Sequence, residues 1–314
     1  MLRFSESSIY SLDLKRYIIT KAGADNRHWI VPPGIGVRKL AFHRIFVLDL
    51  AGLGLGEAAD ANRFQAVGAD TLGHVAVSWP GQLNLPTLQR LGLGNIRIDD
   101  PIAGIPPVEQ PNGFFGRLSM AAQGNRRTTG LREMWDYAGD IRTENVFTTL
   151  TAAGYSVTLA GPFLSYLATQ TPAERFQVGS NQAAFQILYD RLNDPVSGLT
   201  YVVLPEFRFA GEQQDVDAFA GALVDTDRYL EQAIHDLGAN DLLIVTSTHA
   251  ADPTFGVTPT REYLPLLAYS PSRQTGHALG IRRTLADVGA TVLENYGVAT
   301  VTAGHSLLNE ITQI

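Results

Sequence analysis

Three short runs of apolar residues, barely interrupted by polar ones, most constrain the fold of this chain. They lie at residues 45–48, 200–204 and 242–246. Continuous apolar runs of this length are typical of strands buried on both faces, because a half-exposed strand would alternate apolar and polar residues. Helical patterns occupy residues 181–192 and 216–237 between these runs. The alternation predicts an α/β fold, a three-layer sandwich in which helices cover both faces of a mostly parallel central sheet.

Weaker patterns add further elements to this sandwich. Residues 86–91 favour a helix, because they begin with proline, which a first turn tolerates, and are followed by glycine. Residues 142–160 favour a helix, a break at Gly154 and then a strand at 156–159. Residues 99–112 are rich in proline and aspartate, so we expect a loop there.

The chain divides into an N-terminal extension, residues 1–42, and a core domain, residues 43–314. The extension contains two β-prone runs, at residues 16–21 and 29–31, and a Pro-Pro-Gly sequence closes the second. Such runs could form a hairpin or add an edge strand to the main sheet.

Composition excludes several classes of function. The chain has 314 residues, a net charge of -7 and scattered basic residues, which argues against a nucleic-acid partner. It contains no cysteine, so disulfides, thiolate metal sites and cysteine nucleophiles are excluded. The N-terminal residues lack the apolar core of a secretory signal, and no apolar run approaches the roughly 20 residues of a membrane span. We therefore expect a cytoplasmic protein that does not contact a membrane.

Asp49 follows the first apolar run directly, so it stands at the carboxyl end of a predicted strand. Ligands of open α/β sheets bind at that edge, which makes its carboxylate a candidate for handling a metal or a phosphate. The alternative is that Asp49 caps the turn that follows.

Motifs at both ends of the core resemble phosphopentomutases of the alkaline phosphatase superfamily. The N-terminal motifs are GADTLGH at residues 68–74 and LNLPTLQRLGLGNI at 83–96. The C-terminal motifs are HAADPTFGVTPTREYLPLLAYSP at 249–271 and LGIRRTLADVGATVLENYGV at 279–298, in the same order as in the family. The resemblance implies an alkaline phosphatase-like core. In the family a cap domain of about 100 residues precedes the strand at 200–204, but this chain has no room for it, so we expect no cap domain.

The resemblance also implies two divalent metals, which would neutralise a transferring phosphoryl group. Asp49 and His249 match two of the family's metal ligands. Four other ligand positions are replaced, and the residues that stand there are Phe207, Glu212, Thr248 and Pro259. Two ligands do not make a two-metal centre, so we expect no metal cofactor. If new carboxylates rebuild the site, the candidates are Glu206, Glu212 and Asp252, and the metal would be Mn or Zn.

The family's phosphorylated threonine corresponds to Arg127 in this chain, and Arg126 precedes it. Guanidinium groups bind phosphate through two hydrogen bonds, so these arginines could replace part of the lost metal charge. Thr128 and Thr129 precede a predicted helix at residues 131–138, whose first amides also favour an anion. We therefore expect an anion-binding site at Arg126, Arg127, Thr128 and Thr129. The alternative is that the two arginines form surface salt bridges or contact a partner.

These observations favour a degenerate relative of phosphopentomutase, acting as a binding or structural subunit or as a sensor of a sugar phosphate. Arg127 cannot accept and return a phosphoryl group, which a mutase requires. One alternative is a metal-dependent phosphatase or phosphomutase-type enzyme with a rebuilt site. Another is a metal-free sugar-phosphate lyase or isomerase in which His249 acts as acid or base. The expected partners are a phosphorylated small molecule and either another protein or further copies of the chain.

Overall fold

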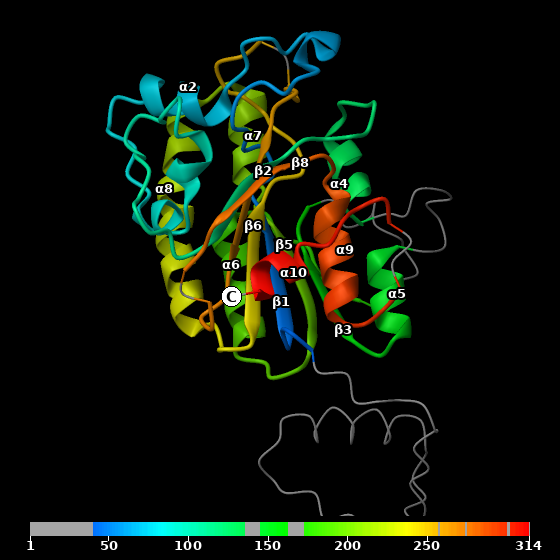
Figure 1. Cartoon of the computed structure of the whole chain (residues 1–314). Helices are drawn as coiled ribbons and strands as arrows, with labels where there is room; N and C mark the ends of the chain where they lie inside the picture. The colour runs from blue at the N-terminus through cyan, green and yellow to red at the C-terminus, as the bar shows by residue number, and fades with distance from the viewer. Residues whose placement is uncertain are drawn as a thin grey trace, which may run out of the picture. The chain divides into compact units, whose positions relative to one another are not determined.

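A computed structural model describes residues 40–135, 145–162, 173–256, 258–273, 275–299 and 302–313. Residues 41–314 form one compact unit, which is the subject of this section (Figure 1). The predicted strands at residues 16–21 and 29–31 lie outside the described residues.

The core is an eight-stranded sheet with the strand order β4-β3-β5-β1-β6-β7-β2-β8. Strand β7 runs antiparallel to both of its neighbours, and all the other adjacent pairs are parallel. The sheet is therefore mostly parallel, as the sequence predicts. The strands are β1 (Arg44–Asp49), β2 (Phe114–Leu118), β3 (Ser156–Ala160), β4 (Glu174–Phe176), β5 (Gly198–Val203), β6 (Asp241–Thr246), β7 (Leu264–Tyr269) and β8 (Ala278–Arg282).

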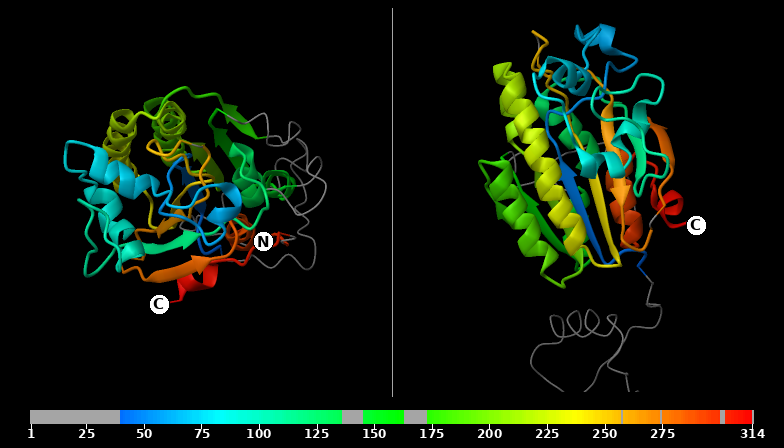
Figure 2. Two further views of the ribbon diagram at one scale, coloured as in Figure 1. Left: turned by 90° about the horizontal axis from the view of Figure 1, so that it is seen from above. Right: turned by 90° about the vertical axis from the view of Figure 1, so that its left-hand side faces the viewer.

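Helices cover both faces of this sheet, as Figures 1 and 2 show. The longest helix, α8, packs against α2, α3, α6 and α7 on one face, whereas α9 packs against α4, α5 and α10 on the other. This arrangement confirms the predicted three-layer sandwich. The helices are α2 (Thr71–Ser78), α3 (Pro86–Arg90), α4 (Arg127–Trp135), α5 (Val146–Ala152), α6 (Asn181–Leu192), α7 (Glu206–Gln213), α8 (Val216–Asp236), α9 (Ala286–Asn295) and α10 (Leu308–Thr312), with short 3-10 helices at Ala61–Phe64 and Leu93–Arg97.

The three apolar runs of the sequence are the three central strands. Strands β5 and β6 are buried along their whole length, and β1 is buried except at its first residue. Strand β1 lies between the other two, so Asp49 is level with Val203 of β5 and Thr246 of β6. The carboxylate that the sequence places at the carboxyl edge is thus at the centre of that edge.

Polar side chains set where the main helices begin. Ser180 accepts a hydrogen bond from the Ala183 amide at the start of α6, and Asp215 accepts one from the Ala218 amide at the start of α8. Such caps satisfy amides that have no partner within the helix. The predicted helices at residues 86–91, 181–192 and 216–237 are confirmed to within one residue.

One helix begins earlier than the sequence predicts. Helix α4 starts at Arg127, so Thr128 and Thr129 lie in its first turn and do not precede it. The cause is local, because the Thr129 hydroxyl accepts a hydrogen bond from the Arg126 amide at 3.1 Å and closes the turn. The described part of the interval between α4 and β5 consists of α5, β3, β4 and α6, all of them in the sandwich.

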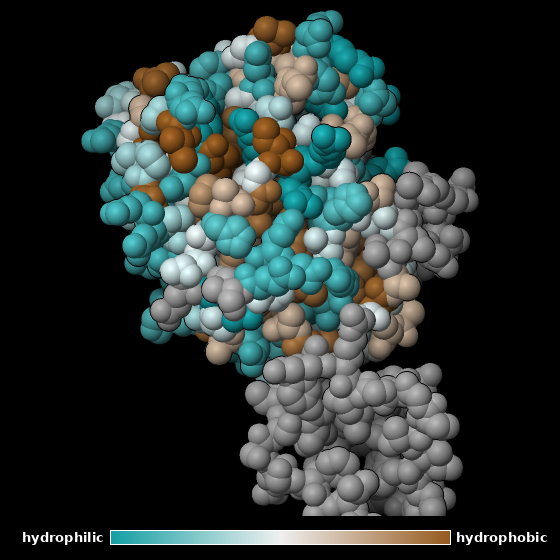
Figure 3. Space-filling view, in the orientation of Figure 1, coloured by the Kyte–Doolittle hydropathy of each residue, from teal (hydrophilic) through white to brown (hydrophobic). Residues whose placement is uncertain are grey.

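The surface in Figure 3 mixes hydrophilic and hydrophobic side chains, with several apolar residues gathered at the upper left. The large apolar side chains that are exposed are Val67, Val77, Ile98, Phe209, Val224 and Ile281. No helix in the described ranges combines the length and the apolar character needed to cross a membrane.

Candidate functional site

Asp49 is fully buried at the carboxyl edge, and its neighbours occupy both of its oxygens. Oδ2 accepts hydrogen bonds from the Tyr201 hydroxyl at 2.6 Å and from the Thr248 hydroxyl at 2.8 Å, and Oδ1 accepts one from the Thr248 amide at 3.0 Å. Burial raises the pKa of Asp49 to about 6, although these hydrogen bonds oppose the rise. The carboxylate is therefore built into the interior between β1, β5 and the loop after β6.

Tyr201 is the residue that sequence reasoning missed at this position. Its ring lies on β5, packed against Trp135 with 4.9 Å between ring centroids and against Phe147 with 6.2 Å. Burial and the nearby charge of Asp49 raise its pKa well above the usual value, so the hydroxyl stays a donor. The run at residues 200–204 did carry a signal, because a tyrosine in a buried strand needs a partner for its hydroxyl.

His249 follows Thr248 at this edge, and its imidazole ring makes only one long polar contact among the described residues. The side chain is buried, with Nδ1 3.5 Å from the Thr248 hydroxyl, and Nε2 has no hydrogen-bond partner in the described parts of the chain. Burial, together with the charges of Arg208 and Arg127, lowers the pKa of His249 to about 3. The imidazole is thus neutral near pH 7, with one unpartnered nitrogen beside two arginines.

Those two arginines share one carboxylate. Arg127 Nη1 lies 2.8 Å from Glu212 Oε1, and Arg208 Nη1 lies 3.4 Å from Glu212 Oε2. Arg208 is nearly buried, with its guanidinium 4.2 Å from the centroid of the Phe209 ring. The sequence identified Arg127 and Glu212 separately and did not identify Arg208. Its signal would have been the spacing of Arg208 and Glu212, four residues apart on one helix face.

The first turn of α4 is held against the loop after β6. A Cβ atom at Gly130 would lie 1.8 Å from the Thr248 carbonyl oxygen, so only glycine allows this approach. The structure therefore brings the predicted anion-binding segment to the carboxyl edge. Arg126 and Arg127 are exposed there, and Thr128 is half-buried.

The other candidate carboxylates lie in separate contacts. Glu206 accepts a hydrogen bond from the Asn181 amide at 2.9 Å, which joins α7 to the start of α6. Asp252 accepts one from the Asp70 amide at 3.0 Å and lies 2.6 Å from His74 Nδ1. Among the described residues, neither carboxylate forms a hydrogen bond or ion pair with Asp49 or His249.

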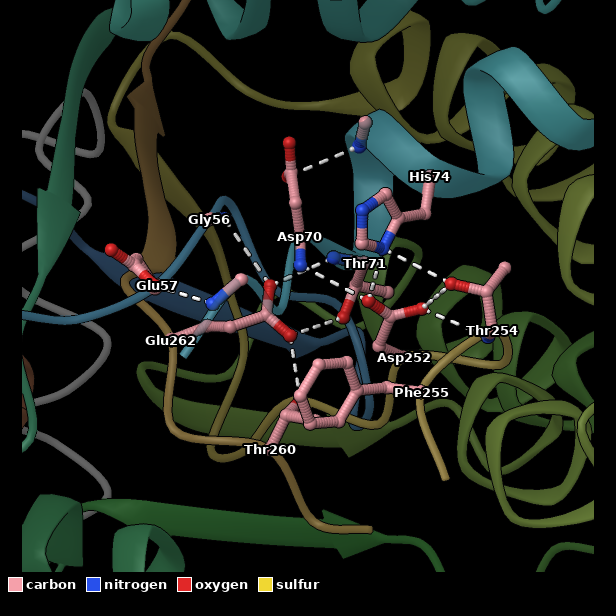
Figure 4. A network of polar contacts seen from close by, with 12 residues as sticks. Gly56, Glu57, Asp70, Thr71, His74, Asp252, Thr254, Phe255, Thr260 and Glu262 are labelled. Atoms are coloured by element: carbon pink, nitrogen blue, oxygen red, sulfur yellow. Dashed lines mark hydrogen bonds and ion pairs between the residues drawn. The ribbon is translucent and has the colours of Figure 1, made fainter. Parts of the chain in front are cut away.

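Asp252 belongs to a polar network that joins the loop after β1 to the loop after β6 (Figure 4). At its centre, buried Glu262 accepts hydrogen bonds from the amides of Gly56 and Thr71 at 3.2 and 2.8 Å. The hydroxyls of Thr71 and Thr260 donate to its other oxygen at 2.7 and 2.6 Å. Burial raises the pKa of Glu262 to about 7 against these bonds. The network fixes the two loops relative to each other.

The residues at the family's metal positions do not fit a two-metal centre. Phe207 has no ligand atom and is fully buried, with its ring centroid 5.4 Å from that of Phe219. The Thr248 hydroxyl donates a hydrogen bond to Asp49. Across the described ranges, no group of three or more histidine, cysteine, aspartate or glutamate side chains is placed to hold a metal ion. A divalent metal would have to compete with Tyr201 and Thr248 for the oxygens of Asp49.

Solved structures share this fold, among them a member of the alkaline phosphatase superfamily. A Vibrio parahaemolyticus protein of this superfamily matches with a TM-score of 0.51 and 13% identity, covering 97% of this chain and 78% of that one. A putative sulfatase from Bacteroides thetaiotaomicron matches with a TM-score of 0.53 and 10% identity, covering 85% and 74%. At these identities the likeness shows the fold alone.

Sequence comparison gives the family. The pattern of the metalloenzyme superfamily matches residues 43–300. A phosphopentomutase from Levilactobacillus brevis is 27% identical over an alignment of 395 positions, gaps included, which covers 87% of this chain and all of that protein. The chain therefore belongs to the metalloenzyme superfamily and is a homologue of phosphopentomutase, which confirms the predicted resemblance.

Proposed function

We propose that this protein binds a phosphorylated small molecule at the carboxyl edge without catalysing a mutase reaction, and serves as a binding or structural subunit or as a sugar-phosphate sensor. The observation that carries the proposal is the hydrogen bonding of the Asp49 carboxylate. Three hydrogen bonds from Tyr201 and Thr248 use both of its oxygens. A metal at this carboxylate would compete with these donors for the lone pairs of its oxygens, and each buried donor that lost its acceptor would cost about 1–3 kcal/mol.

Arginine provides the positive charge that the proposal needs. Arg127 stands where the family has its phosphorylated threonine, and α4 brings it to the edge beside Arg208. A guanidinium binds the oxygens of a phosphate but cannot carry a phosphoryl group. The same residue therefore supports binding and argues against phosphoryl transfer.

The test combines metal content with ligand binding. The full chain is dialysed against Mn or Zn, returned to metal-free buffer and examined by elemental mass spectrometry. We expect far less than one ion per chain, and calorimetric binding of ribose 5-phosphate that a chelator leaves unchanged. Retention of about one or two ions, with sugar-phosphate turnover that the chelator abolishes, would favour the metal-dependent enzyme.

A second candidate is a metal-free sugar-phosphate lyase or isomerase. The observation in its favour is that Nε2 of His249 is buried and unpartnered, beside Arg127 and Arg208. The imidazole could act as a general base on a bound sugar phosphate, whose negative charge would raise the low pKa of His249. Turnover of ribose 5-phosphate in chelator that is lost in His249→Gln would favour this candidate, whereas binding without turnover favours the first proposal.

A subunit role also requires a partner, either another protein or a second copy of this chain. Size-exclusion chromatography with light scattering tests the second case. A mass above that of one chain is the expected result for a homo-oligomer.

A further inference from the structure

Glu212 joins two arginines that come from different helices. Arg127 begins α4 and Arg208 lies in the first turn of α7, which also carries Glu212 at its end. The Glu212 carboxylate pairs with Arg127 at 2.8 Å and with Arg208 at 3.4 Å. One carboxylate thus bridges two guanidinium groups at the carboxyl edge of the sheet.

The charges of this cluster are unequal. In these contacts two guanidinium groups pair with one carboxylate. The Arg208 side chain is only 8% exposed, so water screens little of its positive charge. A dianion would balance the two arginines better than a single carboxylate does, and a phosphate group presents the oxygens that guanidinium forks bind.

His249 adds an independent sign of a ligand. Its side chain is 3% exposed, and Nε2 has no hydrogen-bond partner among the described residues. Buried polar groups in native proteins usually have a partner. In the tautomer with a proton on Nε2, this nitrogen could donate a hydrogen bond to an anion held by the arginines.

Building on the proposed function, we propose that Glu212 is an internal competitor at the anion site. A phosphate monoester dianion would displace the Glu212 carboxylate and bridge Arg127 and Arg208, within reach of His249. The displaced side chain can move into solvent, because Glu212 is already 31% exposed and lies at the end of α7. Arg208 takes the place in the site that the sequence assigned to Arg126.

The decisive variant is Glu212→Gln, which keeps the side-chain size and removes the competing charge. Binding of inorganic phosphate and of ribose 5-phosphate is measured by calorimetry on the full chain in buffer of about 0.15 M ionic strength. We expect affinity to rise by up to about fivefold, since an ion pair of this kind contributes up to about 1 kcal/mol. Arg127→Gln and Arg208→Gln should each weaken binding at least about tenfold.

The matched control is Glu231→Gln. Glu231 also pairs with an arginine, Arg90, at 3.6 Å, but on the α3 and α8 side of the sheet. It changes the net charge of the protein by the same amount as Glu212→Gln. Phosphate affinity should stay within about twofold of that of the unmodified protein, because exposed charges act weakly over long distances in salt.

The outcomes separate the inference from the proposed function. Phosphate binding that becomes tighter in Glu212→Gln but not in Glu231→Gln supports the role of Glu212 as an internal competitor. Binding that Arg127→Gln weakens but Glu212→Gln does not strengthen overturns the competitor and leaves the anion site in place. Unchanged binding in a folded Arg208→Gln variant, or in Arg208→Met if the first does not fold, also overturns it. A lack of phosphate binding in every form, Glu212→Gln included, overturns both.

Discussion

The Tyr201 hydroxyl donates a 2.6 Å hydrogen bond to the Asp49 carboxylate across the adjacent strands β5 and β1. Both residues are fully buried. The resemblance of the sequence predicts a metal-ligand position at Asp49, and here a phenol donates to one of its oxygens. The interaction makes this carboxylate part of the packing of the sheet.

Replacing this tyrosine tests how much the contact stabilises the fold. Tyr201→Phe removes the hydroxyl and leaves a buried carboxylate short of one donor, so we expect a loss of about 2–3 kcal/mol in the free energy of unfolding. Urea denaturation measures it. Tyr189→Phe is the control, because the Tyr189 hydroxyl donates to a neutral acceptor, the Tyr229 carbonyl, at 2.9 Å. A loss no larger than that of the control would contradict a special role for the Asp49 contact.

The sequence alone predicts the three central strands and the two main helices. Strands β1, β5 and β6 are continuous apolar runs, and α6 and α8 begin at Ser180 and Asp215, which are recognisable caps. Helix α7 was missed because only eight residues form it and tertiary contacts support it. A Cβ atom at Gly211 would lie 2.2 Å from the Ala251 carbonyl oxygen, so this helix is fitted closely to another loop.

The candidate site was only partly predictable for a related reason. The position of Asp49 at the carboxyl edge follows from the end of one strand, which is local information. Its partner Tyr201 is 152 residues away, and Glu212 is 85 residues from Arg127. Pairing over such separations depends on the order of strands and the docking of helices, which apolar patterns do not specify.

The pKa of Glu262 predicts how stability depends on pH. The value rises from 4.5 to about 7 in the folded protein, because burial disfavours the charged form. The folded state therefore holds a proton that the unfolded state has lost between these values. Stability is greatest below pH 4.5 and falls by about 3 kcal/mol as pH rises to 7, as far as this one group is concerned. Asp49, raised to about 6, acts in the same direction.

Glu262→Gln should remove most of this pH dependence. The amide oxygen can accept from the Gly56 and Thr71 amides, and its nitrogen can donate to the Thr260 hydroxyl, which also accepts. Thermal unfolding between pH 4.5 and 7.5 measures the effect. Glu109→Gln, at an exposed glutamate, is measured in parallel as the control. An equally steep decline in Glu262→Gln would show that another group titrates.

The close approach of α4 to the loop after β6 predicts opposite effects for two glycine substitutions. In Gly130→Ala the new Cβ would meet the Thr248 carbonyl oxygen at 1.8 Å, so α4 must shift away from the edge. We expect a loss of about 2 kcal/mol or more and weaker phosphate binding, because Arg127 would move with the helix. Gly221→Ala on α8 meets no atom within 4 Å and should stabilise the protein by about 0.5–1 kcal/mol. Equal changes in the free energy of unfolding for the two substitutions, measured by urea denaturation, would contradict the close contact at Gly130. Unchanged phosphate affinity in a folded Gly130→Ala protein would show that anion binding does not depend on the position of α4.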